Sequence, residues 1–342
     1  MSVIDDGPPP PEAGIFGLDC TPETSRVVLI PVPFDATASY GLGAEDGPRA
    51  ILKASHQLDL FDVEIGSPYA AGICMLDEDY HVRMWNSEAR ELVNQARAML
   101  HDETVAAEDR ASLCTRIDGI GDQLNAWLDD QVRQYLQAGR IVGVVGGDHS
   151  VPFAAVRAHL QQYPDLGLLH VDAHADLREA YEGFTWSHAS ILNNIVSKTN
   201  VRQVVQVGVR DLCEAEYRTI SASEGRIQTF FDHTLAHWRF AGEPFDKSLE
   251  RIVAALPEDV YVTFDIDGLD PALCPGTGTP VPGGLGFREA SALLAAVVRS
   301  GRRIVGFDLV EVAPSHADSE WDGNVGARIL YKLCGHALSS AR

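Results

Sequence analysis

The sequence lacks any long apolar run. Although 45% of its 342 residues are hydrophobic, enough for a large buried core, no stretch approaches the roughly 20 apolar residues of a membrane-spanning helix. Residues 1–14 are acidic and rich in proline, without the basic and then apolar order of a secretion signal. We therefore expect no membrane segment, and we interpret residues 1–25 as a flexible N-terminal arm.

The sequence is also poor in positive charge. Lysine and arginine together number 27, against 49 aspartates and glutamates, and the formal net charge is −22. Such a surface repels phosphate groups, so neither nucleic acid nor an anionic membrane is expected as a partner. A small cationic ligand is favoured instead.

Cysteine is scarce as well. The six cysteines lie far apart and none forms a Cys-x-x-Cys pair, so the usual spacing of a structural zinc site is missing. In a chain of this length without a secretion signal, we interpret them as reduced thiols of a cytoplasmic protein.

What the chain does contain is a regular alternation of short apolar runs and amphipathic segments. We expect strands at Arg26–Val32, Gly72–Leu76, Ile141–Val145, Leu166–Val171, Gln203–Val207, Ile227–Phe231, Val260–Phe264 and Ile304–Val310. We expect helices at Glu88–Leu100, Gln123–Leu136, Ser187–Val196, Leu249–Leu256, Arg288–Val298 and Asn324–Leu338. Several strands are rich in Val, Ile and Leu without alternation, which indicates a sheet covered on both faces.

This order of elements predicts an α/β fold, a three-layer α/β/α sandwich with a central, mainly parallel sheet of about eight strands. The chain shows no internal repeat and no clear linker, so we expect one domain over residues 26–342. Residues 101–121 are polar and acidic, and we interpret them as a surface insertion.

Three short motifs, each at the end of an expected strand, carry six possible metal ligands. They are His149 in Gly-Gly-Asp-His-Ser, Asp172, His174 and Asp176 in Asp-Ala-His-Ala-Asp, and Asp265 and Asp267 in Asp-Ile-Asp-Gly-Leu-Asp-Pro. In an extended segment residues two apart point the same way, and parallel sheets bind ligands at the carboxyl ends of their strands. Any one motif could be an ordinary turn. Three together would bury mutually repelling carboxylates unless cations lay between them, which favours two divalent ions about 3.5–4 Å apart.

With these motifs the chain resembles the ureohydrolase family, which includes arginases and agmatinases, from Arg26 to its C-terminus. Residues 275–280, Pro-Gly-Thr-Gly-Thr-Pro, and 283–285, Gly-Gly-Leu, also match. The resemblance implies that one metal is held by His149, Asp172, Asp176 and Asp265 and the other by His174, Asp172, Asp265 and Asp267. It also implies a homo-oligomer, a trimer or a hexamer. The oxygen-rich site and the family favour Mn²⁺, with Ni²⁺ as the alternative.

The activity implied by this resemblance is hydrolysis of a guanidino C–N bond, which yields urea and ammonia or an amine. A water bridging two divalent cations becomes hydroxide near neutral pH and would attack the guanidinium carbon. By resemblance, Asp176 passes a proton to the leaving nitrogen and Glu311 pairs with the guanidinium, as a carboxylate can with two N–H groups. Thr279 contacts the nitrogen side. His188 shuttles protons, a task that an ordinary histidine pKa near 6.5 suits.

Alternatives to these last roles remain. Glu311 could be a solvated acid at a strand end, and His188 a structural histidine. Relatives often have His-Gly where this chain has His188-Ala189, and the alanine adds a methyl group beside the site.

The loop at residues 177–187 should select the substrate. Arg178 could neutralise a carboxylate, and Glu179 or Glu182 could bind a distal amine; each could equally be solvated. Aromatic residues, Tyr181, Phe184 and Trp186, could close around a short cation through cation–π contacts or simply pack the loop. Because the loop is bulky, we expect agmatine, a short alkylguanidine or free guanidine rather than arginine, and we favour a small guanidine.

Three rival functions stand beside this one. A formimino-group hydrolase of the same family would release formamide in place of urea. A non-catalytic subunit of a mixed oligomer would be expected to lack a ligand, and all six are present. A deacetylase-like enzyme would use a single zinc and a different ligand pattern.

Overall fold

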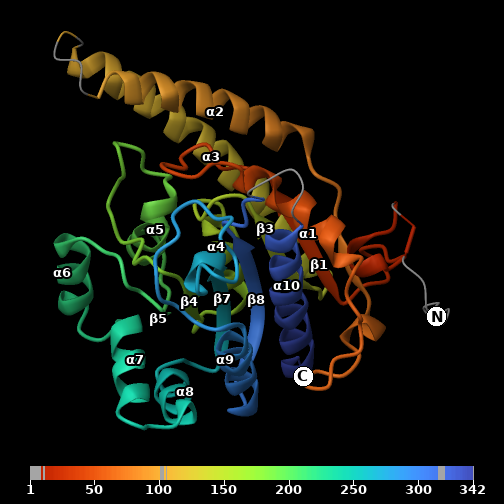
Figure 1. Ribbon diagram of the computed structural model, residues 1–342. Helices are drawn as coiled ribbons and strands as arrows, with labels where there is room; N and C mark the ends of the chain where they lie inside the picture. The colour runs from red at the N-terminus through yellow and green to blue at the C-terminus, as the bar shows by residue number, and fades with distance from the viewer. Residues whose placement is uncertain (1–8, 11, 101–103, 105, 315–319, 342) are drawn as a thin grey trace.

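Eight parallel strands pair into one sheet at the centre of the protein (Figure 1). The computed structural model describes residues 9–10, 12–100, 104, 106–314 and 320–341. The strands are β1 Val27–Val32, β2 Ile73–Met75, β3 Ile141–Gly146, β4 Gly167–Val171, β5 Gln203–Val207, β6 Ile227–Phe230, β7 Asp259–Asp265 and β8 Arg303–Val310. Their order is β2-β1-β3-β8-β7-β4-β5-β6. All eight predicted strands are therefore confirmed, as is the parallel sheet.

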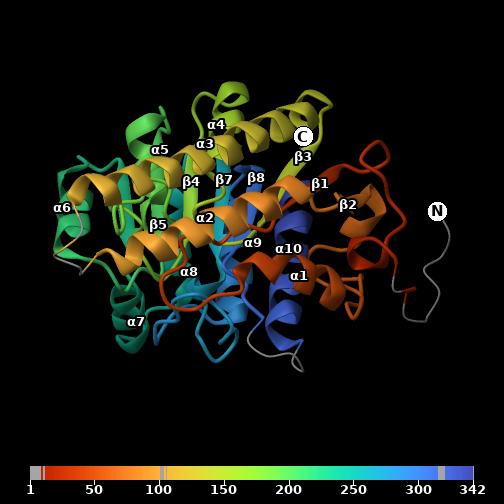
Figure 2. The ribbon, with the colours of Figure 1, turned by 90° about the horizontal axis from the view of Figure 1, so that it is seen from above.

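Helices cover both faces of the sheet, which completes the predicted three-layer sandwich (Figure 2). In the described residues they are α1 Gly47–Ser55, α2 Tyr80–Ala98, α3 Ala107–Gln137, α4 Phe153–Gln162, α5 Ile191–Lys198, α6 Glu214–Ala222, α7 Asp232–Phe240, α8 Phe245–Ala254, α9 Phe287–Arg299 and α10 Trp321–Ser340. One face carries α1, α9 and α10, which pack on β3 and β8. The other carries α3, α4 and α5, each in contact with the next.

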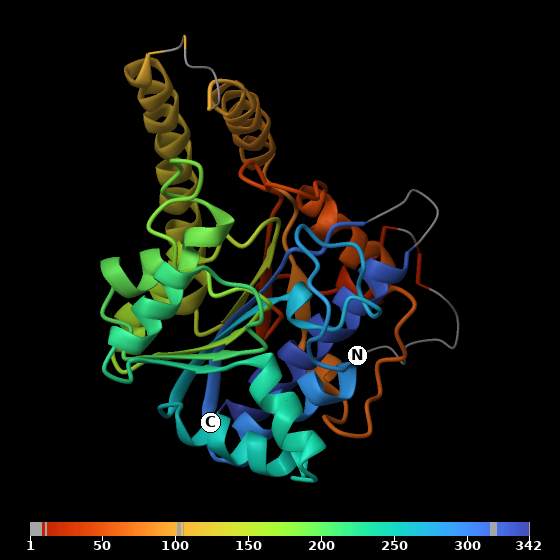
Figure 3. The same cartoon turned by 60° about the vertical axis from the view of Figure 1, so that its left-hand side comes forward.

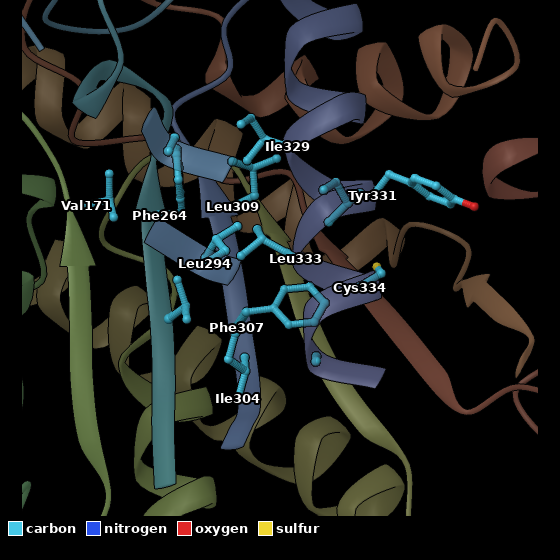
Figure 4. Close-up of a cluster of buried hydrophobic side chains, with 14 of the residues drawn as sticks. Val171, Phe264, Leu294, Ile304, Phe307, Leu309, Ile329, Tyr331, Leu333 and Cys334 are labelled. Carbon is cyan, nitrogen blue, oxygen red and sulfur yellow. The ribbon is translucent and has the colours of Figure 1, made fainter. Parts of the chain in front are cut away.

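Each face of the sheet has its own apolar core. On the α9–α10 face, Phe307 and Leu309 of β8 pack beside Phe264 of β7 and against α10 (Figure 4). On the opposite face, Val144 of β3 and Leu168 of β4 pack beneath α3 and α4. Successive residues of a strand point to opposite faces of the sheet. A strand between two helical layers therefore buries the side chains on both of its faces. This explains their continuous apolar runs.

The segment predicted to be a surface insertion is mostly helix, which corrects that expectation. Residues 107–121 form the first half of α3, and residues 101–103 and 105 lie outside the described part of the chain. Leu113, Ile117 and Ile120 are buried at a spacing of three to four residues. The acidic residues between them hide this periodicity. The result is a long antiparallel hairpin of α2 and α3, whose far end projects past the body of the protein (Figure 3).

Part of the predicted N-terminal arm is packed into the body. Ile15 and Phe16 are at most 3% exposed, and the Phe16 backbone N–H donates a 2.8 Å hydrogen bond to Ser55 Oγ of α1. Residues 1–8 and 11 lie outside the described residues. Among the helices that the structure describes, none is both long and apolar enough to cross a membrane.

Candidate metal centre

Four neighbouring strands bring their carboxyl ends together at one edge of the sheet. The order β3-β8-β7-β4 places the loop after β3 beside the residue that follows β8. His149 and Glu311, 162 positions apart in the chain, are joined there by a hydrogen bond. Asp265 ends β7, and Asp172 directly follows β4. Because these strands are parallel, their distant motifs form a single site.

The imidazole of His149 faces three buried carboxylates. Its Nδ1 lies 2.9 Å from Asp172 Oδ2 and 3.2 Å from Asp176 Oδ2. The third oxygen, Asp265 Oδ2, is 3.3 Å away. All four residues are at most 5% exposed. His149 Nδ1 nevertheless makes no well-aligned hydrogen bond. The oxygens surround this nitrogen as ligands surround a shared cation.

A second group adjoins the first and shares Asp172 with it. His174 Nδ1 lies 3.1 Å from Asp267 Oδ2 and 3.5 Å from Asp172 Oδ1. Asp267 Oδ2 is buried without a hydrogen-bond partner. The His174 side chain is 23% exposed, so this end of the pocket opens to solvent. The two groups share Asp172, which is one of the two residues, with Asp265, that the resemblance implies for both metals. Each ligand role stays a prediction.

The pKa shifts in the pocket show that its crowded carboxylates favour a nearby positive charge. Burial, together with repulsion by Asp172, raises the pKa of Asp176 to about 6. Burial and the neighbouring acids Asp267 and Asp172 raise the pKa of Asp265 well above its ordinary value. Burial alone would lower the pKa of His174, but Asp172 and Asp267 outweigh it and raise that pKa to about 12. A bound cation would lower the pKa values of these acids and displace a proton from His174.

Two divalent cations fit this donor set. The orphaned atoms, His149 Nδ1 and Asp267 Oδ2, belong one to each group, and Asp172 offers one oxygen to each. Carboxylate and imidazole donors of this kind suit Mn²⁺ and are also accepted by Ni²⁺. When bound, such ions would polarise a water molecule and lower its pKa toward neutrality.

Glu311 borders the same pocket on the β8 side. Its Oε1 accepts a 2.9 Å hydrogen bond from the His149 backbone N–H, and its own N–H donates to Gly147 O at 2.8 Å. A methyl group at Gly278 would lie 2.8 Å from Oε2, so glycine leaves this oxygen uncovered. Burial, with the charge of Asp148, raises the pKa of Glu311 well above its usual range. A cationic group beside Glu311 would reverse that effect. Glu311 is only 5% exposed, which removes the alternative of a solvated acid.

His188 lies at the open side of the pocket. Its Nδ1 is 3.5 Å from Thr37 Oγ1 and its Nε2 is 3.4 Å from Ser39 Oγ. Burial, followed by the positive charge of His174, lowers the pKa of His188 to about 4, below the ordinary value on which its predicted role was based. The imidazole is therefore neutral at neutral pH. Ala189 lies in a short 3-10 turn without a positive φ, so it needs no glycine.

Comparison with known proteins decides the family. The model of the arginase family matches residues 25–335. The chain belongs to the arginase family. It is 34% identical to an N(1)-aminopropylagmatine ureohydrolase of Thermus thermophilus, over 94% of each protein. It is 32% identical to the agmatinase of Bacillus anthracis, over 87% of each.

Solved structures agree on the fold. The proclavaminate amidino hydrolase of Streptomyces clavuligerus superimposes with a TM-score of 0.71 over 96% of this chain and 98% of that one, at 23% identity. The predicted family and fold are thus confirmed. Membership in the arginase family makes the chain a metal-dependent hydrolase of C–N bonds, which removes the deacetylase-like enzyme and the non-catalytic subunit.

Side chains inside the strands contact the predicted ligands of this arginase-family pocket, and sequence analysis missed them. His149 Nε2 lies 2.9 Å from Thr263 Oγ1, and that hydroxyl donates a 2.9 Å hydrogen bond to Asp308 Oδ1. The imidazole therefore donates from Nε2, which leaves the Nδ1 lone pair for a cation. Thr263 and Asp308 are register partners on β7 and β8. The signal available in the sequence was that Thr263 and Asp308 are polar residues inside otherwise apolar strands.

His170 supports Asp172 in a similar way. Its Nδ1 accepts a 3.1 Å hydrogen bond from Gln206 Nε2, so the proton is on Nε2, which donates to Asp172 Oδ2 at 2.8 Å. Although His170 is close enough to join the ligand cluster, this bonding makes it a support for a ligand. The alternation of Asp172 and His174 extends back to His170 and could have revealed it.

The aromatic residues of the loop 177–187 have different surroundings. The ring of Tyr181 lies edge-on to His188, with centroids 5.7 Å apart. Phe184 is 1% exposed. Trp186 packs on Phe153 and against Gly121 of α3, where a methyl group would lie 2.5 Å from the indole. This packing favours the alternative in which the indole holds the loop in place, and a substrate contact by Trp186 stays an untested prediction.

The remaining predicted site residues are also placed. The Arg178 guanidinium lies over the Tyr181 ring, 5.3 Å from its centroid, and 3.8 Å from Glu216 Oε2. Thr279 is half-buried in the segment that follows Gly278. No contact of Thr279 with the His/Asp cluster is described, so its role also stays a prediction.

Proposed function

We propose that this arginase-family enzyme hydrolyses a guanidino compound with an alkylamine tail, such as agmatine or N(1)-aminopropylagmatine, to urea and an amine. One observation carries the proposal. The buried carboxylate of Glu311, with Oε2 facing Gly278, borders the His/Asp cluster. A planar cation bound to this carboxylate would have its carbon beside the place where water is activated.

The roles of the protein groups follow from their positions. Glu311 binds and orients the guanidinium. Asp176 takes a proton from the attacking water on its carboxylate and passes it to the leaving nitrogen. His188 is neutral at the mouth of the pocket, where a pKa of about 4 makes it a weak proton acceptor and favours a hydrogen-bonding role over the proton transfer implied by the resemblance. The cations would be held by the six ligands named above, and we favour Mn²⁺ over Ni²⁺.

The tail of the substrate is inferred from the loop and from the relatives. Arg178 is the single cation of residues 177–187, and it is already engaged by Tyr181 and Glu216. The loop thus offers no free cation to the carboxylate of arginine, whereas Glu179 is exposed and suits a distal amine. Relatives at 34% and 32% identity are named for aminopropylagmatine and agmatine. An amine tail is therefore favoured over free guanidine.

A urea-release panel tests the proposal. Purified protein is loaded with Mn²⁺ or Ni²⁺ and assayed on N(1)-aminopropylagmatine, agmatine, methylguanidine, guanidine and arginine. We expect the highest kcat/KM on one of the two amine-tailed compounds. Fastest turnover of free guanidine would leave the proposed reaction intact but overturn the claim that the substrate carries an alkylamine tail. Fastest turnover of arginine would overturn the substrate class.

A formimino compound in the same panel separates the remaining rival. Release of formamide, with no urea from any guanidino compound, would replace the proposed reaction by formimino hydrolysis. Metal analysis of the unloaded protein, with both ions available in the growth medium, decides between Mn²⁺ and Ni²⁺. Sedimentation of the same sample tests the predicted trimer or hexamer.

A further inference from the structure

One arginine of α2 joins the two loops at the mouth of the pocket. We call residues 33–43, after β1, the first mouth loop and residues 177–187, after β4, the second mouth loop. Arg97 Nε donates to Glu182 Oε2 of the second loop at 2.7 Å. Its Nη1 donates to Ala38 O at 2.9 Å and its Nη2 to Thr37 O at 3.1 Å, both in the first loop. Every nitrogen of the guanidinium is used.

The sheet itself does not bring these loops together. Three strands, β3, β8 and β7, separate β1 from β4 in the sheet order. The link is instead made by the α2–α3 hairpin, which lies beside both loops in Figure 1 and contacts both through Arg97. A guanidinium suits this task because its planar fork presents N–H groups in fixed directions.

The hairpin also holds each loop separately. From α2, Asn86 Oδ1 accepts a 2.9 Å hydrogen bond from the Asp35 backbone N–H in the first loop. From α3, Asp118 Oδ1 accepts a 2.9 Å hydrogen bond from the Thr185 backbone N–H in the second loop. The hairpin is thus a frame for both loops, and Arg97 links them to each other.

The separation of the loops determines the surroundings of His188. Thr37 Oγ1 and Ser39 Oγ approach its two ring nitrogens from the first loop. The Tyr181 ring approaches it from the second loop. Any change in the distance between the loops must therefore change the gap beside His188. A tail that leaves the pocket beside His188 would have to part contacts of 3.4 and 3.5 Å, so its binding would depend on how far the two loops can separate.

We propose that Arg97 is a positioning residue that determines specificity: it holds the two mouth loops at the separation that grips an alkylamine tail. The statement about the tail rests on the proposed function. Free guanidine has no tail, so its turnover depends on Glu311 and the His/Asp cluster and not on Arg97. Arg97 touches neither of these groups.

Hydrogen exchange tests the link without any assay of activity. Arg97→Gln should raise amide exchange in both mouth loops. Glu182→Asn should raise it in the second loop alone, because Arg97 still holds Ala38 and Thr37; asparagine also tolerates the positive φ of 52° at this position. Arg116→Gln is the matched control, since Arg116 is exposed on α3 and has no described bond to either loop. Unchanged exchange in Arg97→Gln would overturn the link.

Kinetics test the specificity. We expect Arg97→Gln to raise the KM of the preferred amine-tailed compound about tenfold, the loss of roughly one charge-assisted hydrogen bond. The KM of free guanidine, the kcat at saturation and the metal content should stay within about twofold, because uniform binding of the tail is what is lost. Arg97→Lys should recover part of the effect. An equal rise for both compounds would overturn the specificity.

The two proposals fail in distinguishable ways. If the wild-type protein releases urea from no guanidino compound, the proposed function fails and the claim about the tail falls with it. The exchange pattern of the two loops then still shows whether Arg97 links them. If urea is released and Arg97→Gln leaves the ratio of the two KM values unchanged, the inference about Arg97 alone fails.

Discussion

The pocket and its mouth are built by different means. The His/Asp pocket consists of side chains at the ends of four adjacent strands, and its residues are at most 5% exposed apart from His174. The mouth consists of two loops held from outside by a helical hairpin through partly exposed groups; the side chains of Arg97 and Glu182 are 25% and 22% exposed. The comparison suggests that the sheet determines the reaction, whereas the hairpin determines which substrates reach it.

The largest effect should come from a ligand of the pocket. We expect Asp265→Asn to weaken metal binding at least about 100-fold, because changes to groups that only support a ligand already cost 10- to 100-fold. His188→Asn, at the mouth, should keep the metal. Metal content after desalting, measured by mass spectrometry, checks both. Equal metal content in the two variants would contradict the ligand role of Asp265.

Sequence analysis found the pocket because its signals are local. Each motif follows its own apolar run, so strand ends and a parallel sheet were enough to bring His149, Asp172 and Asp265 together. The supports were missed because Thr263 and Asp308 are single polar residues inside strands. Their meaning depends on the register of β7 with β8, which no local pattern contains.

The mouth was beyond sequence analysis for a physical reason. Arg97 and its partner Glu182 are 85 residues apart, and their pairing depends on where the hairpin lies on the folded body. The short helices α1, α4, α6 and α7, of 9, 10, 9 and 9 residues, were missed as well. Length alone does not explain this, because α5 and α8, of 8 and 10 residues, were predicted. In α6 and α7 only Glu216 and Leu235 are buried, so these two helices carry no apolar stripe for the periodicity to reveal.

A second large effect should come from the substrate side of the pocket. Glu311→Gln keeps the shape of the side chain but removes its charge, so a guanidinium would lose its ionic partner in a buried site. We expect kcat/KM to fall about 100-fold, the equivalent of about 3 kcal/mol, for substrates with and without a tail. Metal content should not change. If Glu311→Gln instead lowered kcat/KM by different factors for substrates with and without a tail, Glu311 would have to lie at the mouth.

Metal binding by the pocket should depend on pH. The pKa values of His149 and His174 lie above their ordinary range, so each imidazole must lose a proton before a cation binds. Affinity should therefore rise about tenfold per pH unit for each proton displaced. Asp176 has a pKa raised to about 6, so it adds a further proton, and a steeper loss, as the pH falls below about 6.

Calorimetry in buffers of different ionisation heat counts the released protons. Asp176→Asn should remove the steeper branch below pH 6 and leave the slope above it. The hydrogen bonds of Arg97 at the mouth should depend less on pH than metal binding does. They involve two backbone carbonyls and a carboxylate that is partly open to water. A metal affinity independent of pH between 6 and 8 would contradict the ligand roles of the two histidines.

The smallest effect should come from Trp186, and it decides what this residue does. Trp186→Phe keeps an aromatic ring but removes the 2.8 Å hydrogen bond from Nε1 to Asp122 Oδ1. If the indole only holds the second mouth loop on α3, unfolding free energy should fall by about 1 kcal/mol and kcat/KM by no more than about threefold. Urea denaturation and the urea-release assay check the two quantities. A loss of activity as large as that of Glu311→Gln, at unchanged stability, would instead place the indole against the substrate.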